Sequence, residues 1–237
     1  MDTKKEQDNN KTNTRWVTFN NKKYSLTQIA KKLGTTSKRL DYHLHKGRDI
    51  NHIFYFLTKK VVKNDKSKYI ISYDPGHDGA IVVYRDGSLY SKGVVPQVSG
   101  KTLDLNLFIK FFSKFKDKDV VVVYEELHAL FRVSASATFT LGYHMGVIKT
   151  MTQTLGMKSV AVKPKEWQKE MWGGFDKIMV KKKGNKKKTV DTKATSLKVC
   201  RSMFPSLDLR KNDRCTNPHD GIVDALLLAE YAKRKNL

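Results

Sequence analysis

Four acidic residues in this chain stand where an apolar strand or helix could carry them to one place. Asp74 ends the run Tyr-Ile-Ile-Ser-Tyr, and Glu125 ends the run Val-Val-Val-Val-Tyr. Asp220 and Asp224 lie four residues apart, so on a helix they share one face. If the two strands pair side by side, all four carboxylates meet at one edge of a sheet.

Such a gathering of carboxylates has a definite chemistry. Buried carboxylates repel one another, because each charge loses hydration and gains like-charged neighbours. The site is stable mainly when hard cations occupy it, and ligands that are all oxygen suit Mg²⁺ or Mn²⁺ better than zinc. Two such ions about 4 Å apart can activate water and stabilise the leaving oxygen of a phosphodiester. The four acids are therefore predicted to be catalytic residues and metal ligands.

Each acid also has an ordinary structural interpretation when it is taken alone. Asp74 opens an Asp-Pro-Gly turn, and an aspartate in the first turn of a helix, such as Asp220, commonly interacts with the helix dipole. Their joint placement favours the catalytic interpretation. Glu126 is a poorer candidate than Glu125, since it should point to the opposite side if the strand continues. The sequence leaves open which of the two faces the metals.

The rest of the chain is strongly basic and indicates a polyanionic partner. Its 237 residues carry 46 Lys and Arg against 23 Asp and Glu, a formal net charge of +23. Such a balance favours nucleic acid or an anionic membrane surface. No apolar run approaches the roughly 20 residues of a spanning helix, so we expect no membrane association. Cys200 and Cys215 lack a zinc-like spacing and are interpreted as free thiols in a reducing, cytoplasmic compartment.

The elements that position the acids are predicted in residues 69–237. Three short runs separated by turn residues predict an antiparallel meander, the all-apolar run before Glu125 predicts a buried strand, and a fifth short strand follows a long helix. The predicted strands are Tyr69–Tyr73, Ala80–Tyr84, Leu89–Val95, Val120–Tyr124 and Ser159–Val162. The predicted helices are 103–115, about 134–155, one that begins at Pro164, about 192–204, and 218–233.

The N-terminal part predicts a separate small module. Residues 1–14 are polar and predict a disordered tail, 15–60 resemble a helix-turn-helix, and 61–68 form a linker. The exposed face of its second helix is predicted to contact DNA. The residues of that face are Lys38, Arg39, Tyr42, His43 and Lys46. A helical dimerisation or docking unit is the alternative.

A lysine-rich loop, residues 177–193, is the second predicted DNA contact. Beside a phosphodiesterase site its lysines can bind phosphates, although a solvated charge run is the plain alternative. The lysines are Lys181, Lys182, Lys183, Lys186, Lys187 and Lys188. Phe131 is a further candidate DNA contact, with a buried core residue as the alternative.

The acidic motifs resemble those of RuvC-type Holliday-junction resolvases, in particular the phage and virus-like branch. The likeness runs from about Tyr69 to the C-terminus and includes Pro164-Lys-Glu-Trp-Gln-Lys and Met203-Phe-Pro. It implies an RNase H-like fold (a mixed five-stranded sheet flanked by helices), a homodimer acting inside a phage-infected cell or equivalent compartment, and two symmetric Mg²⁺-dependent nicks in a four-way DNA junction.

Carried onto this sequence, the resemblance matches Asp74, Glu125 and Asp224 to the family's metal ligands. Many relatives have another acid three residues before the last one, where this chain has Gly221. Asp220 or His219 could serve as the fourth ligand instead. Two other hypotheses stay open: a nuclease for flaps, forks or RNA in hybrids, and a DNA-binding regulatory protein with an inactive nuclease core.

Overall fold

The computed structural model describes residues 15–19, 22–32, 36–45, 66–98, 102–126, 134–181 and 187–237. They belong to two units, one before and one after the boundary between residues 59 and 60. Five residues predicted to bind DNA lie outside the described part: Lys46, Phe131, Lys182, Lys183 and Lys186. For Arg39 and His43 only the backbone is described.

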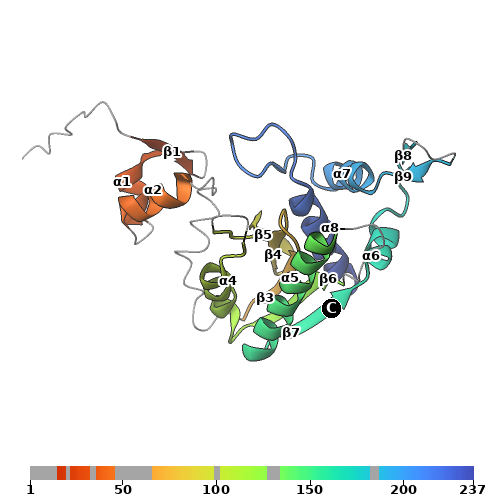
Figure 1. Cartoon of the computed structure of the whole chain (residues 1–237), viewed down its shortest axis with the longest axis horizontal. Helices are drawn as coiled ribbons and strands as arrows, with labels where there is room; N and C mark the ends of the chain where they lie inside the picture. The colour runs from red at the N-terminus through yellow and green to blue at the C-terminus, as the bar shows by residue number, and fades with distance from the viewer. Residues whose placement is uncertain are drawn as a thin grey trace, which may run out of the picture. The chain divides into compact units, whose positions relative to one another are not determined.

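The larger unit is built on a mixed five-stranded sheet (Figure 1). Its strands are β3 (Lys68–Asp74), β4 (Ala80–Arg85), β5 (Ser88–Val94), β6 (Asp119–Glu125) and β7 (Lys158–Val162). The order across the sheet is β5-β4-β3-β6-β7. β3, β4 and β5 form the antiparallel meander, while β6 pairs in parallel with β3 and with β7. This 3-2-1-4-5 order with flanking helices is that of the RNase H-like fold, so the predicted fold class is confirmed.

Local sequence explains why the meander folds tightly. Asp86 and Gly87 have φ values of +49° and +75°, the left-handed conformation that a two-residue hairpin turn needs at both central positions. The centre of β6 is buried throughout, as expected for a strand that is covered on both faces.

Helices cover both faces of the sheet. One face packs against α8 (Asp220–Arg234), with α6 (Pro164–Met171) and α7 (Thr192–Met203) in the same hydrophobic cluster. On the other face lie α4 (Leu105–Phe112), the 3₁₀ turn Ser113–Phe115 and α5 (Ala135–Thr154). There Tyr69 meets Phe115 edge-on, and Tyr73 meets Phe108. None of the described helices is long and apolar enough to cross a membrane.

A short hairpin interrupts the region predicted as a loop. β8 (Met179–Val180) pairs in antiparallel fashion with β9 (Thr189–Val190). The backbone N–H of Asp191 donates to the carbonyl of Ile178, which ties the base of this hairpin directly to the start of α7.

The N-terminal unit contains β1 (Trp16–Phe19), β2 (Lys22–Ser25), α1 (Leu26–Lys32) and α2 (Ser37–His45). Strand β2 was not among the predicted elements. Ser25 and Gln28 exchange backbone-to-side-chain hydrogen bonds at the start of α1, as in a capping box. The buried core consists of Ile29, Ala30, Leu40 and Leu44. The helix-turn-helix assignment stays a prediction, since residues 33–35 lie outside the described part.

Candidate active site at the ends of two parallel strands

Asp74 and Glu125 end neighbouring parallel strands. Tyr73 of β3 is paired with Tyr124 of β6, so each acid follows a paired tyrosine at the same edge of the sheet. Side chains alternate along a strand, which places Asp74 with Ser72, and Glu125 with Val123, on the face that α8 covers.

α8 brings the second pair of acids to this edge. The hydroxyl of Ser72 donates a 2.6 Å hydrogen bond to the carbonyl oxygen of Ala225, inside the core. This bond fixes the strand residue two before Asp74 against the helix residue that follows Asp224. The apolar side chains after Asp224, such as Leu226 and Leu228, are buried against the sheet and hold the helix there.

Gly221 allows the start of α8 to approach the turn after β3. A Cβ atom at this position would lie 2.2 Å from the carbonyl oxygen of Asp78 and 3.0 Å from Oδ2 of Asp74. Any side chain here would therefore collide with backbone. The position where the family resemblance expects a further acid has no room for one.

The electrostatics of the site identify three acids as one cluster. Burial raises the pKa of Asp74 well above its usual range, and the charges of Asp224 and Glu125 raise it further. The pKa of Asp224 rises to about 7 through burial and repulsion from Glu125, although a hydrogen bond from Ser196 lowers it. The pKa of Glu125 is raised by burial and lowered by its hydrogen bond with Trp167. These carboxylates lack a sufficient positive charge, which is what a bound cation would supply.

Asp220 differs from the other three in its exposure and its partner, although its charge also raises the pKa values of Asp74 and Asp224. Its side chain is half exposed and accepts a 2.6 Å hydrogen bond from Nζ of Lys193 on α7. The lysine also interacts electrostatically with Asp224 and Asp74. Lys193 is therefore a positive charge at the rim of the cluster, held there by Asp220.

His219 directly precedes Asp220 as the N-terminal cap residue of α8. Its Nδ1 atom is buried and has no hydrogen-bond partner among the described residues. Burial and the charge of Lys211 lower its pKa, while Asp78 acts in the opposite direction. Asp78 itself pairs with His77 at 3.0 Å. A neutral imidazole with an unsatisfied buried nitrogen is a chemically suitable ligand next to these acids.

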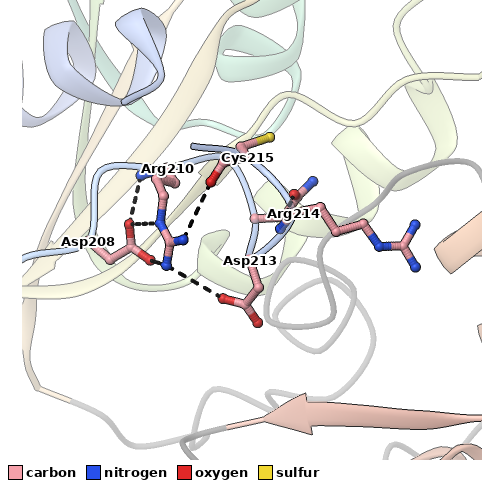
Figure 2. Close-up of polar contacts among 6 residues, drawn as sticks. Asp208, Arg210, Asp213, Arg214 and Cys215 are labelled. Carbon is pink, nitrogen blue, oxygen red and sulfur yellow. Dashed lines mark hydrogen bonds and ion pairs between the residues drawn. The ribbon is translucent and has the colours of Figure 1, made fainter. Parts of the chain in front are cut away.

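The loop before α8 is braced by its own charged residues (Figure 2). Arg210 donates to both carboxylate oxygens of Asp208 at 2.9 and 2.8 Å and lies 4.0 Å from Asp213. It also donates to the carbonyl of Cys215, whereas the Arg214 side chain extends away from this group. The backbone N–H of His219 donates to the carbonyl of Leu209, which lies between Asp208 and Arg210 in the same loop. The contacts of this loop therefore help to fix where α8 begins.

The residues fit a divalent cation in chemical type. The three clustered donors are carboxylates, as Mg²⁺ and Mn²⁺ prefer. As the side chains stand, however, no three His, Cys, Asp or Glu residues of the described ranges form a group that could hold a metal ion.

The predicted DNA-binding side chains that are described are all exposed. They are Lys38 and Tyr42 on α2, and Lys181, Lys187 and Lys188 beside the β8–β9 hairpin. The two groups belong to different units.

Sequence reasoning missed the residues that support the acids. Trp167 was noted only as part of a motif, and Lys193 only as a member of a lysine run. Their partners, Glu125 and Asp220, come from distant parts of the chain. No pattern of residues singles out Ser196, which forms a hydrogen bond with Asp224.

Comparisons with known proteins gave matches among solved structures alone. No protein-family model and no curated protein matches the chain. RuvC of Thermus thermophilus in complex with a Holliday junction substrate is similar over 69% of this chain and 92% of its own, with 13% identity and a TM-score of 0.44. A second Thermus thermophilus RuvC structure is similar over 71% of this chain and 96% of its own, with 14% identity and a TM-score of 0.41.

Proposed function

We propose that this protein is a divalent-metal-dependent endodeoxyribonuclease that cuts branched DNA, with the four-way junction as its principal substrate. The observation that carries the proposal is the cluster of Asp74, Glu125 and Asp224, whose partly buried carboxylates oppose one another's ionisation inside a protein of net charge +23. The choice of junction over other branched DNA comes from the sequence resemblance to the RuvC-type resolvases.

In this proposal the three clustered acids hold two Mg²⁺ ions, for which Mn²⁺ can substitute, with Asp220 or His219 as a further ligand. The bound ions supply charge stabilisation and activation of water for phosphodiester hydrolysis. Lys193 contributes a positive charge of the protein itself. Its ammonium group lies at the rim of the acid cluster, where it can bind an oxygen of the scissile phosphate and orient it.

The basic hairpin is proposed to hold the DNA next to these acids. The hydroxyl of Thr195 accepts from the backbone N–H of Ile178, so the hairpin base is fixed to the helix that carries Lys193. Phosphates bound by Lys187 and Lys188 would therefore lie in one continuous surface with the site. The N-terminal unit adds a second DNA contact through Lys38 and Tyr42.

A homodimer is proposed through the outer face of α5. Phe139 is 78% exposed there, and Lys149 is the only Lys, Arg, Asp or Glu in the twenty residues of this helix. An exposed aromatic on a face with so little charge, in so basic a chain, suits a second copy better than DNA.

Cleavage of a mobile four-way junction with mapped nick positions tests this function. Wild type should introduce paired symmetric nicks with Mg²⁺ or Mn²⁺, and Asp74→Asn should abolish them. Asp117→Asn is the matched control, because Asp117 is an exposed acid in the turn before β6. A junction that is bound but left uncut in either metal would indicate an inactive core. Faster cutting of flaps or forks at equal concentration would replace the junction as the principal substrate.

A further inference from the structure

Glu125 accepts a hydrogen bond from a residue that has no part in the proposed metal binding or DNA contacts. The indole Nε1 of Trp167 donates to Oε1 of Glu125 at 2.9 Å. Trp167 is 1% exposed, although it belongs to α6, forty-two residues further along the chain. A buried indole N–H has one proton to donate and no acceptor capacity, and here that proton is used on an acid of the cluster.

The position of Trp167 is itself fixed. Pro164 occupies the first turn of α6 directly after β7, and this suits a helix start because proline needs no hydrogen-bond acceptor there. Trp167 then packs in the same core cluster as Val123 of β6, and its ring meets that of Trp172 edge-on at 6.4 Å. The donor therefore sits on a rigid support on the same side of the sheet as Glu125.

This contact decides how Glu125 can bind a cation. A free glutamate has several rotamers and can offer one or both oxygens to a metal. With Oε1 engaged by the indole, Oε2 is the oxygen that remains free of this bond. Hydrogen bonds to ligating carboxylates commonly orient the ligand and change metal affinity.

We propose that Trp167 is a positioning residue that holds Glu125 in place as a one-oxygen ligand for the divalent cation. The inference rests on the proposed function, since it takes Glu125 to be a metal ligand. It predicts that loss of the indole N–H weakens metal binding even where the protein remains folded.

Trp172 provides a matched control. It is 7% exposed, packs against Trp167, and its Nε1 is buried without a hydrogen-bond partner among the described residues. Trp→Phe at either position removes the same atoms from the same cluster. Only the change at Trp167 removes a donor from a carboxylate of the site.

The test is Mn²⁺ titration by calorimetry on the full chain, with thermal unfolding of each variant recorded. Trp167→Phe should raise the Kd for Mn²⁺ by about 10-fold or more, while Trp172→Phe stays close to wild type. Wild-type affinity in Trp167→Phe, or an equal loss in Trp172→Phe, overturns the inference. Asp74→Asn distinguishes failure of the Trp167 inference from failure of the proposed function. If Asp74→Asn binds Mn²⁺ like wild type, or if wild type binds no Mn²⁺, the proposed function has failed.

If Trp167→Phe does not fold, NMR of the wild-type protein tests the positioning role instead. The chain has three tryptophans, so the three indole N–H resonances in a ¹⁵N spectrum can be assigned with Trp16→Phe and Trp172→Phe. The Trp167 resonance should shift on addition of Mg²⁺ and remain unchanged in Asp74→Asn. An unmoved Trp167 resonance in wild type that binds Mg²⁺ refutes the positioning role.

Discussion

Burial and repulsion from Glu125 destabilise the ionised form of Asp224. Removal of this charge should therefore make the metal-free protein more stable. Burial and the charge of Glu125 raise the pKa of Asp224 from an ordinary value of 3.8 to about 7 in the folded chain. The folded state holds the proton of this carboxyl more tightly than the unfolded chain does, which stabilises the fold. This stabilisation is complete below pH 3.8 and is lost as the pH rises to about 7. Holding the proton up to about pH 7 corresponds to a free energy of unfolding of about 4 kcal/mol, and this stabilisation is lost once the pH exceeds 7.

Asp224→Asn keeps the shape of the side chain and an oxygen that can accept from Ser196, but it carries no charge. In EDTA at about pH 8 we expect the variant to exceed wild type by up to about 4 kcal/mol in free energy of unfolding. At about pH 5.5 the gain should fall to about 2 kcal/mol, because wild type is then largely protonated at this residue while the unfolded chain is not. For a chain of this size the larger gain corresponds to a rise in Tm of about 8 °C or more.

Thermal and urea unfolding at both pH values measure the effect, with Asp117→Asn as the control for removing one exposed negative charge. Excess Mg²⁺ should reduce or reverse the difference in free energy of unfolding between Asp224→Asn and wild type, because the ion should stabilise wild type and not the variant. The reasoning is refuted if, in EDTA at about pH 8, Asp224→Asn is no more stable than wild type.

Three other perturbations test the neighbouring features. If Asp220 acts by holding Lys193, then Asp220→Asn and Lys193→Gln should lower the nicking rate by similar factors, and the double variant should be little worse than either one, as a double-mutant cycle would show. Phe139→Glu on α5 should convert a dimer to a monomer in sedimentation, whereas a dimer of unchanged stability would place the interface elsewhere. Lys187→Gln with Lys188→Gln should reduce the slope of log affinity for junction DNA against log salt by about 2, and an unchanged slope would show that these lysines do not contact phosphate.

The sheet was predictable because its strands are short, apolar and separated by strong turn residues. The ends of all five predicted strands lie within one residue of the ends of β3 to β7. Both Asp74 and Glu125 could be placed at strand ends because the run before Glu125 is wholly apolar and the run before Asp74 is interrupted only by Ser72. The helix that carries Asp224 was predicted for a similar reason, since a run of alanine and leucine follows it.

The supporting contacts could not be predicted, because they join segments whose approach depends on the whole fold. Trp167 reaches Glu125 across forty-two residues, and Ser72 reaches Ala225 across 153. The β8–β9 hairpin was missed for a different reason. Its strands have two residues each and lie among lysines, so neither hydrophobic alternation nor strand propensity gives a signal.

The tight packing at Gly221 also limits which residues can stand at this position. Because a Cβ atom at Gly221 would lie 2.2 Å from the carbonyl oxygen of Asp78, an acidic side chain cannot be placed there while the backbone stays where it is. The helix would first have to move outward, which would break the Ser72–Ala225 bond that fixes the strand against it. Under the proposed function, a fourth ligand must therefore come from a different position, and a pattern that demands two acids three residues apart would not match the start of this helix.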